Sequence, residues 1–464
     1  MASDPRQRID ASGLRSSLES FLAQVRRETK VPGIAVAVSI EGVRIGASAG
    51  VVALDRDEPI TTATPFHLGC ITKLLLAIVV LELAWQRQLD LNVPIEDYLP
   101  ELRGTIHGKT VTLSHLLSHT SGYRGLNVME PGTLSMRWDD LVEHLGSAPQ
   151  HFTPGTVFSY EHSESVVVGE IVRRVTGESA TALISETIFA RLGLTPHTLG
   201  NGDAPFAAGQ HVLDPSTRRF KQVRWSDLAA AGVSALPPEW EAAFSRHALS
   251  VEALVSIAEL VMGQHGSLLR RAPLSAATVS LLQSPAVEIV PVIGGALAET
   301  LPATFGLGAS RWRDGFCGIA GATYGQCQGF RFDARTGIAV AVGINAQQRY
   351  LRDLVIGRIC ETLASAASAP QAAPADFPFE DVVGEYHGAR NDRLFADVDD
   401  GRLVLVLESG AMPMKLRAEI IRAPDGRLVL SSPAPDLSVG VFRTDDDDFG
   451  IMIGVSAYRR VRRV

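Results

Sequence analysis

The apolar positions at the start of the chain follow three patterns in succession. Residues 14–30 place apolar side chains on one side of a helical repeat and charged ones on the other, which predicts an amphipathic helix. Two β-rich apolar runs follow, Ile34–Ile40 and Val43–Gly50, and Glu41-Gly42 between them is a hairpin turn signal. Gly69–Gln88 has a helical pattern so apolar in its first turns that we expect a buried central helix.

The segment that follows, up to residue 364, ends with β-rich runs and a helical pattern, the same kinds of element with which the chain begins. Residues 110–310 alternate helical and loop patterns with many Gly and Pro residues. β-rich runs return at Gly325–Phe332 and Ile338–Asn345, and a helical pattern at Arg349–Ala364 follows them. Strands at both ends with helices between them predict an α/β fold, in which one antiparallel sheet is assembled from both ends of the unit and flanked by helices.

The composition changes near residue 363. Residues 363–378 are rich in Ala and Pro, which is typical of a linker. Short alternating runs beyond it predict a small antiparallel β-barrel or sandwich. The predicted strands are Gly384–Gly388, Leu394–Val398, Arg402–Leu407, Lys415–Ile421, Arg427–Leu430, Val439–Arg443 and Ile451–Tyr458. We therefore divide the chain into a first domain over residues 1–365, a linker over 366–379 and a β domain over 380–464.

Composition and charge narrow the function classes. The chain has 464 residues, a net charge of −8 and no stripe of Lys and Arg, which argues against a nucleic-acid partner. Its longest apolar stretch, Leu74–Leu83, contains Glu82 and is too short to cross a bilayer, and no secretory leader precedes the first helix. We therefore expect a cytoplasmic protein without a membrane partner. The 4 cysteines are too widely spaced for a disulfide scaffold or a zinc ribbon, so they should be free thiols.

Cys70 and Lys73 open the apolar helix. Residues three apart share one face of a helix, so the thiol and the amine would be neighbours. Desolvation at this place favours a neutral lysine, which can act as a base, and a charged one would stabilise a thiolate. An isolated Cys-x-x-Lys is more often a buried cysteine with a lysine that extends to solvent, so its context decides.

Seven segments supply that context, and the first of them ends with Cys70-x-x-Lys73. They are Ile60–Lys73, Leu89–Leu91, Tyr98–Glu101, Thr112–Gly122, Pro154–Tyr160, Val175–Gly177 and Arg191–Leu194. Together, over residues 14–365, they resemble the class C β-lactamase and esterase branch of the β-lactamase/penicillin-binding-protein superfamily, whose nucleophile is the serine of Ser-x-x-Lys. The resemblance implies a β-lactamase-like fold with Cys70 at the place of that serine. The β domain resembles the lipocalin-like appendage of some esterases and aminopeptidases in this branch.

The second motif of the family is Tyr-x-Asn, and the matching residues are Tyr160, Glu161 and His162. The resemblance implies that Tyr160 shuttles protons with Lys73 between the nucleophile, the leaving group and the acceptor. His162 either takes the structural place of the asparagine, which we favour, or adds a second base that titrates near neutral pH. Glu161 is expected to point into solvent.

The third motif, Lys-Thr-Gly or His-Thr/Ser-Gly, lies on a strand beside the nucleophile, and the matching segment is Gly318–Gly325. Ile319 and Ala320 carry neither the cation nor the hydroxyl of that motif. The substrate-binding surface at these two positions is therefore predicted to have lost the anchor for a substrate carboxylate. The backbone does not depend on those side chains, so the amides of Cys70 and Ala322 are expected to form an oxyanion hole.

Three further patterns are interpreted as coincidental or structural. Gly46–Gly50 and Gly325–Gly329 match the spacing of a Gly-x-Ser-x-Gly nucleophile turn, the second with cysteine, but both lie in strand sequence. His115 and His119 have the spacing of metal ligands without the glutamate of a zinc-protease motif. We therefore predict neither a metal nor a cofactor.

A cysteine at the nucleophile position favours acyl transfer. Thiols ionise at about pH 8.5, far more easily than serine. A thioester also favours amines over water more than an oxygen ester does. We expect a transacylase that takes an acyl group from a small-molecule ester or a carrier-protein thioester onto Cys70 and passes it to an amine or alcohol, as in amide-bond formation during antibiotic or other natural-product biosynthesis. Two alternatives stay open: an esterase- or amidase-type hydrolase, and a non-catalytic binding descendant of the fold.

Overall fold

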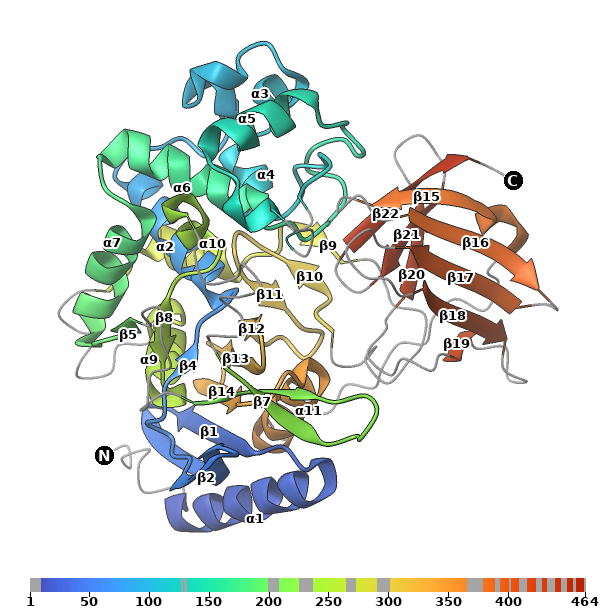
Figure 1. Ribbon diagram of the computed structural model, residues 1–464. Helices are drawn as coiled ribbons and strands as arrows, with labels where there is room; N and C mark the ends of the chain where they lie inside the picture. The colour runs from blue at the N-terminus through green and yellow to red at the C-terminus, as the bar shows by residue number, and fades with distance from the viewer. Residues whose placement is uncertain are drawn as a thin grey trace.

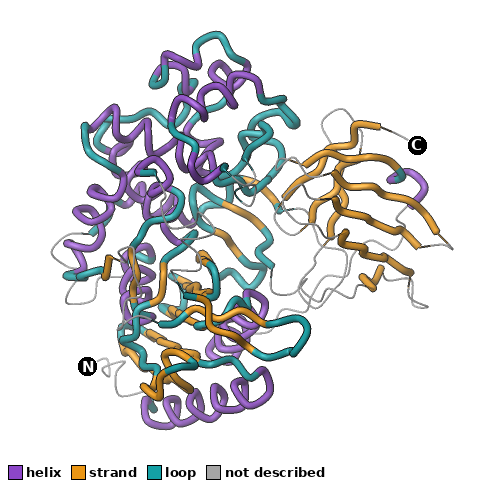
Figure 2. Tube along the Cα trace, viewed as in Figure 1, coloured by secondary structure: helices purple, strands orange, loops and turns teal. Residues whose placement is uncertain are grey.

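Two large antiparallel sheets organise the chain (Figures 1 and 2). The computed structural model describes residues 10–126, 128, 132–198, 208–224, 237–263, 273–289, 301–364, 379–388, 393–399, 402–408, 415–422, 428–431, 439–443, 449–453 and 456–462. The predicted linker at 366–379 lies, except for its last residue, outside the described residues. The domain boundaries derived from it therefore stay a prediction.

The larger sheet has nine strands in the order β3-β2-β1-β14-β13-β12-β11-β10-β9. They are β1 (Gly33–Ile40), β2 (Val43–Ala53), β3 (Arg56–Pro59), β9 (Val287–Glu288), β10 (Thr304–Phe305), β11 (Ser310–Arg311), β12 (Cys317–Thr323), β13 (Gln326–Asp333) and β14 (Ile338–Ile344). Ile34 of β1 lies opposite Ile344 of β14, so strands from the two ends of the unit are neighbours, as predicted. Glu41 and Gly42 turn the β1–β2 hairpin with φ of 49° and 83°, the left-handed conformation that a two-residue hairpin requires.

Helices cover both faces of this sheet (Figure 1). The α-helices are α1 (Ala11–Thr29), α2 (Ile71–Trp85), α3 (Ile106–Thr110), α4 (Leu113–Leu117), α5 (Trp138–Ser147), α6 (Ser163–Thr176), α7 (Ala180–Ile184), α9 (Val251–Val261), α10 (Ala276–Gln283) and α11 (Arg349–Ala364). A π-helix continues α7 as η5 (Ser185–Ala190), and the 3-10 turns are η2 (Ile95–Asp97), η3 (Pro100–Leu102), η4 (Thr133–Ser135), η6 (Pro238–Ala242) and η8 (Phe379–Val382).

Alternate residues of each strand face two different cores. Ile34 and Val36 of β1 pack on the side of α1 and α11, whereas Ala35 and Ala37 pack on the side of α2 and α9. Every residue of α2 from Ile71 to Leu83 is buried, as the apolar run predicts. The helix that carries the candidate nucleophile is therefore fixed by packing on all sides.

Two small sheets lie beside the large one. β8 (His247–Leu249) pairs with β4 (Phe66–His67) and β5 (His197–Thr198), and β6 (Gln210–Leu213) pairs with β7 (Phe220–Val223). β4 leads directly into the start of α2, so the three-stranded sheet fixes the approach to Cys70.

The C-terminal unit is an eight-stranded antiparallel sheet, shown in orange and red in Figure 1. Its strands are β15 (Gly384–Gly388), β16 (Arg393–Asp399), β17 (Arg402–Glu408), β18 (Lys415–Arg422), β19 (Leu428–Ser431), β20 (Val439–Arg443), β21 (Phe449–Ile453) and β22 (Ser456–Arg462). The prediction of one strand over Ile451–Tyr458 is wrong, because Ile453 and Ser456 pair with each other in a hairpin. The apolar pattern does not distinguish the two strands, so the sequence predicted them as one.

Among the described residues, a hydrogen bond of β22 links this unit to the first. The guanidinium of Arg459 in β22 donates to the backbone carbonyl of His151, which follows α5. Within the described part of the chain, none of the helices is both long and apolar enough for a membrane span.

Candidate active site

Cys70 lies at the N-terminal end of α2, as its capping residue. Gly69 before it has φ of 52°, and a Cβ there would lie 2.7 Å from the carbonyl oxygen of Ala322 in β12. A Cβ on Gly321 would overlap the carbonyl oxygen of Leu68. Glycine at both positions therefore allows β12 to approach the start of α2, and this approach places Ala322 beside the thiol.

The surroundings of Cys70 stabilise its thiolate. Burial raises the pKa of Cys70, but the charge of Lys73 lowers it. Hydrogen bonds from the Tyr160 hydroxyl and the Ala322 N–H to the sulfur lower the pKa further, as does the charge of Arg349. The pKa of Cys70 consequently lies below its ordinary value.

The other three thiols are shifted in the opposite direction. Burial raises the pKa of Cys317, raises that of Cys327 to about 11 and raises that of Cys360 further. All three are buried in the core, whereas Cys70 is only half-buried. Cys70 is therefore the thiol whose position and ionisation suit a nucleophile.

Lys73 is buried, with 5 % of its surface exposed. Its Nζ donates a hydrogen bond to the carbonyl oxygen of Ala243 at 3.1 Å and lies 3.2 Å from Nδ1 of His162. The ring centroids of Tyr160 and Phe244 lie 5.3 and 4.8 Å from the same nitrogen. The alternative in which Lys73 extends to solvent is therefore wrong.

The loop that receives Lys73 gave no signal in the sequence. It follows η6 and is fastened to α2 by Ser245, whose Oγ lies 2.9 Å from Oγ1 of Thr72. The backbone N–H of Ser245 also donates to Oγ1 of Thr72 at 3.3 Å. The acceptor for Lys73 is a backbone carbonyl, so no residue type marks this position.

Tyr160 stands between the thiol and two imidazole rings. Its hydroxyl bonds to Cys70, and its ring lies 4.4 Å from that of His119 at 45° and 5.3 Å from that of His162 at 89°. The structure thus brings together Cys70, Lys73 and Tyr160, as the sequence predicted.

His162 caps α6 and lies against Lys73. It is 8 % exposed, and its ring packs at 4.7 Å from that of Phe244. Because Nδ1 faces the Lys73 amine, it can accept a hydrogen bond from that amine. The two interpretations of His162, a structural substitute for the asparagine and a second base, both stay predictions.

The prediction that Glu161 points into solvent is wrong. Its side chain is buried, and Oε1 accepts hydrogen bonds from the backbone N–H groups of Leu126, His162 and Ser163 at 3.1, 2.8 and 3.0 Å. A Cβ on Gly125 would overlap this carboxyl group. The carboxylate turns inward because it satisfies three N–H groups, two of them at the start of α6.

A second buried carboxylate, that of Glu164, contacts His119, whose ring packs against Tyr160. Glu164 contacts Nδ1 of His119 and accepts a hydrogen bond from the Ser121 hydroxyl. Burial raises the pKa of Glu164 well above its ordinary value, although hydrogen bonds from Ser121 and the charge of Lys73 act against this. This pair was not predicted from the sequence. Its only signal was an acidic residue next to the apolar run of α6 and four positions after Tyr160.

The third motif is placed as expected on β12. Ile319 is 5 % exposed and belongs to the apolar core that includes α2, and Ala320 is half-buried. Among the described residues, none accepts a hydrogen bond from the Cys70 N–H, whereas the Ala322 N–H points to the Cys70 sulfur. Both amides are thus available at one point beside the thiol.

The patterns set aside in the sequence have structural places. Gly46–Gly50 lies within β2, and Gly325–Gly329 covers a turn and part of β13. Nδ1 of His115 accepts the backbone N–H of Thr112 at 3.2 Å, and Nδ1 of His119 contacts Glu164. In the part of the chain that is described, no three His, Cys, Asp or Glu side chains are grouped as a metal site.

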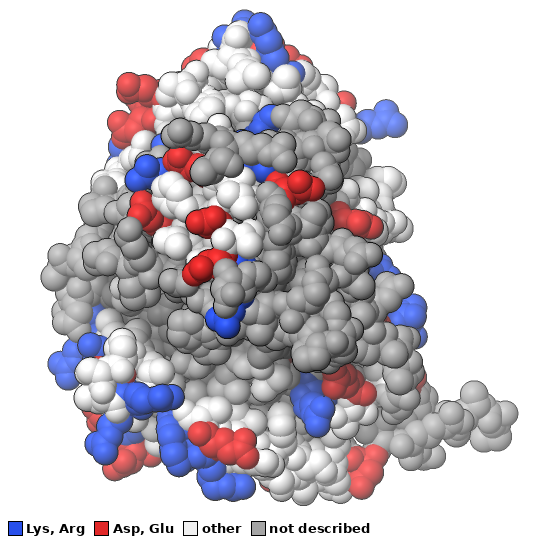
Figure 3. All heavy atoms as spheres, turned by 90° about the vertical axis from the view of Figure 1, so that its right-hand side faces the viewer, with Lys and Arg blue, Asp and Glu red and all other residues white. Residues whose placement is uncertain are grey.

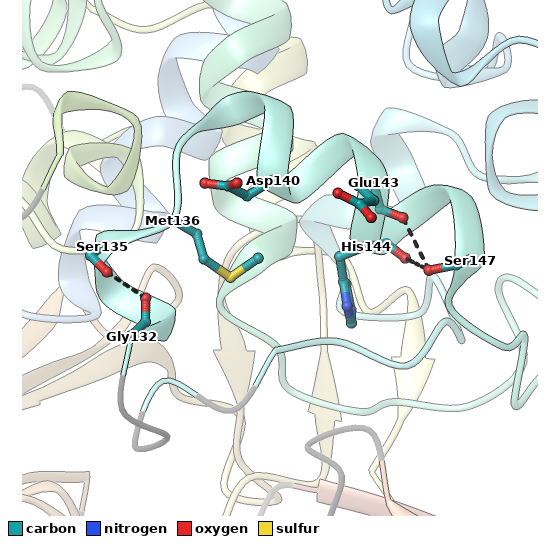
Figure 4. A pocket seen from close by; sticks show the side chains of 7 residues that line it. All are labelled: Gly132, Ser135, Met136, Asp140, Glu143, His144 and Ser147. Carbon is teal, nitrogen blue, oxygen red and sulfur yellow. Dashed lines mark hydrogen bonds between the residues drawn. The ribbon is translucent and has the colours of Figure 1, made fainter.

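A shallow open depression of about 490 Å³ lies elsewhere (Figure 4). It is formed around η4 and α5, and its lining residues are Gly132, Ser135, Met136, Asp140, Glu143, His144 and Ser147. None of the residues around Cys70 belongs to it. Figure 3 shows the side of the molecule with the C-terminal unit, where acidic and basic side chains of the described residues are interspersed.

Comparison with known proteins agrees with this geometry. The model of the beta-lactamase family matches residues 18–355, which contain every site residue discussed above. The chain belongs to the beta-lactamase family. Its nine-stranded sheet with helices on both faces is the fold of this family, as predicted.

Two curated relatives are esterase EstB of Burkholderia gladioli and penicillin-binding protein 4 of Amycolatopsis lactamdurans. The first is 29% identical over 203 residues, which are 40% of this chain and 52% of the relative. The second is 32% identical over 176 residues, 37% of this chain and 45% of the relative. The chain thus spans about half the length of these beta-lactamase-family relatives.

The crystal structure of SurE is similar over nearly the whole chain. It has a TM-score of 0.74 and 22% identity, with 97% of this chain and 100% of that chain covered. At this identity the likeness establishes the fold of both units.

Proposed function

We propose that the protein is a transacylase that carries an acyl group as a thioester on Cys70. The observation that supports this most directly is the convergence on one half-buried thiol of Lys73, the Tyr160 hydroxyl and the Ala322 N–H. Family membership supports the coarser statement of covalent acyl chemistry. The choice of a thiol supports transfer, because a thiolate forms readily and its thioester reacts well with amines.

The first half-reaction loads Cys70. The thiolate attacks the carbonyl carbon of an ester or thioester, and a C–S bond forms while the carbonyl oxygen becomes an oxyanion held by the N–H groups of Cys70 and Ala322. The bond to the leaving oxygen or sulfur then breaks. Tyr160, assisted by Lys73, supplies the proton that the leaving group needs.

The second half-reaction transfers the acyl group from Cys70 to the acceptor. Tyr160 and Lys73 take a proton from the amine or alcohol acceptor, which attacks the thioester carbonyl. A C–N or C–O bond forms, the C–S bond breaks and the thiolate returns. The donor is a small-molecule ester or a carrier-bound thioester, and the setting is cytoplasmic natural-product assembly.

The surface at Ile319 and Ala320 argues against substrates recognised by a carboxylate at this strand. Both side chains are apolar, and Ile319 is part of the core. An acid at this place would lose its hydration without gaining a cationic partner. We therefore propose that the acyl group next to β12 is neutral.

Hydrolysis is the second candidate function, and the similarity to esterase EstB favours it. The two functions differ only in whether water or another nucleophile takes the acyl group. The amine therefore has to be varied in a direct test.

The test is intact mass spectrometry of the protein with activated esters and thioesters, with and without amines. We expect an acyl adduct on Cys70 that amines discharge at least tenfold faster than water does, and no adduct on the Cys70→Ala variant. Discharge at one rate whatever amine is present would replace the transacylase with the hydrolase. A wild-type protein that no donor acylates would instead support a non-catalytic descendant.

A further inference from the structure

A buried arginine lies directly behind the oxyanion strand. Arg352 in α11 is 5 % exposed, and its Nη1 donates a hydrogen bond to the carbonyl oxygen of Gly321 at 3.0 Å. The same nitrogen lies 3.5 Å from the carbonyl oxygen of Gln328, the residue opposite Gly321 in β13. The guanidinium thus binds the carbonyls of one pair of facing residues in β12 and β13.

Asp353 holds this guanidinium in one orientation. Nε and Nη2 of Arg352 donate to the two carboxylate oxygens of Asp353 at 2.9 and 2.8 Å. A two-point pair of this kind fixes the plane of the guanidinium, which leaves Nη1 directed at the strand. Burial lowers the pKa of Arg352, but the charge and the hydrogen bonds of Asp353 raise it, together with the charges of Cys327 and Cys70, and the net shift is upward, so the guanidinium stays charged.

The peptide group between Gly321 and Ala322 connects Arg352 to the thiol. The peptide bonds of the described residues are trans, so the carbonyl of Gly321 and the N–H of Ala322 point in opposite directions from one planar group. Arg352 binds its oxygen, and its N–H bonds to the sulfur of Cys70. A charged donor on the oxygen draws electrons toward it and strengthens the N–H as a donor, by about 10–30 % in typical hydrogen-bond chains.

We propose that Arg352 is a positioning residue of the oxyanion hole: it fixes and polarises the Gly321–Ala322 peptide, so that the Ala322 N–H stabilises negative charge beside Cys70. In the protein without substrate, this charge is that of the Cys70 thiolate whenever the thiol is ionised. In acyl transfer it is the carbonyl oxygen of the substrate, and this part of the proposal rests on the proposed function. Arg352 itself contacts neither the sulfur nor the substrate.

The resting protein gives the first test. The rate of Cys70 alkylation by iodoacetamide is measured against pH, with the site confirmed by mass spectrometry. We expect Arg352→Met to move the midpoint upward by roughly one pH unit, and Arg352→Lys to move it less because the charge is kept. The double variant Arg352→Met/Asp353→Asn should show the same upward shift, which separates the loss of the guanidinium from the release of the Asp353 charge.

A matched control is available in the same part of the structure. Arg331 in β13 is also buried, and its guanidinium lies 4.0 Å from the ring centroid of Trp312 instead of binding the Gly321 carbonyl. Arg331→Met removes a buried guanidinium from the same sheet, and we expect it to leave the alkylation midpoint unchanged. A shift equal to that of Arg352→Met would show that any loss of buried charge acts on Cys70, and would overturn the proposal.

The acyl-enzyme gives the second test. For Arg352→Met we expect acylation to slow by about tenfold with KM unchanged, and the infrared carbonyl stretch of the Cys70 thioester to move to higher frequency. A folded Arg352→Met protein with the wild-type midpoint and the wild-type stretch would reduce Arg352 to a structural role. If this variant does not fold, Arg352→Lys and Arg352→Gln decide, because equal wild-type values in both would overturn the proposal. If no donor acylates the wild-type protein, the proposed acyl transfer is wrong. The alkylation measurement would still test the role of Arg352, because it does not depend on acylation.

Discussion

The candidate site has two walls that are built in different ways. The backbone wall consists of Gly69, Cys70, Gly321 and Ala322, and it depends on the close approach of two main-chain segments. The polar wall consists of His119, Tyr160, Glu161, His162 and Glu164, and it depends on buried side chains that satisfy one another. The geometry of the backbone wall depends only on glycine and on correctly placed N–H groups. Other side chains on β12 can therefore change without moving this wall.

The difference explains how the chain departs from the motifs that it resembles. Ile319 and Ala320 replace polar side chains on β12, and the backbone wall keeps its geometry because those side chains do not build it. In the polar wall a change has to be matched elsewhere. Glu161 is accommodated because Gly125 leaves room for its carboxyl group and because three backbone N–H groups donate hydrogen bonds to it.

The largest effect is expected at Lys73, where the two walls meet. Lys73→Met removes the amine between Cys70 and His162 while it keeps the length and apolar stem of the side chain. We expect acyl transfer to fall by about 10³-fold, because a general base and a charge beside the thiolate are lost together. The measurement is the single-turnover rate of Cys70 acylation. A loss below tenfold would mean that His162 can supply the proton transfer alone.

A test of the backbone wall has the next largest effect. Gly321→Ala puts a Cβ against the carbonyl of Leu68, so β12 has to move away from Cys70. We expect acylation to slow by about 10²-fold, as for the loss of an oxyanion-hole donor, with melting of the protein little changed. The control is Gly146→Ala in α5, where a Cβ would meet nothing within 4 Å. Wild-type rates for Gly321→Ala would contradict the importance of this approach.

The backbone wall is also the part that the sequence predicts well. The apolar run of α2 and the Cys70–Lys73 spacing follow from residue type and period, whereas β12 was expected only from the resemblance of Gly318–Gly325 to the third motif of the family. The polar wall was predicted only at Tyr160 and His162, because the direction of a glutamate side chain depends on partners far away in the sequence. Glu161 finds one of its three N–H donors at Leu126, and Lys73 finds a backbone carbonyl at Ala243. A reading of local pattern contains neither partner.

A substitution in the polar wall should change the stability of the fold more than it changes the rate of acylation. Glu161→Ala removes the acceptor for the N–H groups of Leu126, His162 and Ser163. We expect it to destabilise the fold by about 2 kcal/mol, since buried donors without partners each cost roughly 1–3 kcal/mol and water replaces part of the loss. Urea unfolding measures this, and Glu143→Ala on the exposed surface of α5 is the control. Equal stability of both variants would mean that the start of α6 does not need the carboxylate.

The smallest effect is a change in how stability depends on pH. Burial raises the pKa of Glu164 above its ordinary value of 4.5, so the folded protein holds this proton more tightly than the unfolded chain does. The stabilisation that this gives is complete below about pH 4.5 and is lost as the pH rises toward the pKa in the folded state. Glu164→Gln does not titrate, so its stability relative to the wild type should increase with pH by up to about 1.4 kcal/mol per unit within that window.

Glu170 on the same helix supplies a control of opposite sign. Burial raises its pKa, but hydrogen bonds from Arg173 and Arg174 lower it by more, so its contribution to stability is lost as the pH falls. As the pH rises, the stability of the wild type should therefore increase relative to that of Glu170→Gln. Relative to that of Glu164→Gln it should decrease. Thermal melts of the three proteins between about pH 4 and pH 8 compare the slopes. Parallel slopes for the two variants would show that Glu164 keeps its charge beside His119, which would contradict the raised pKa of Glu164.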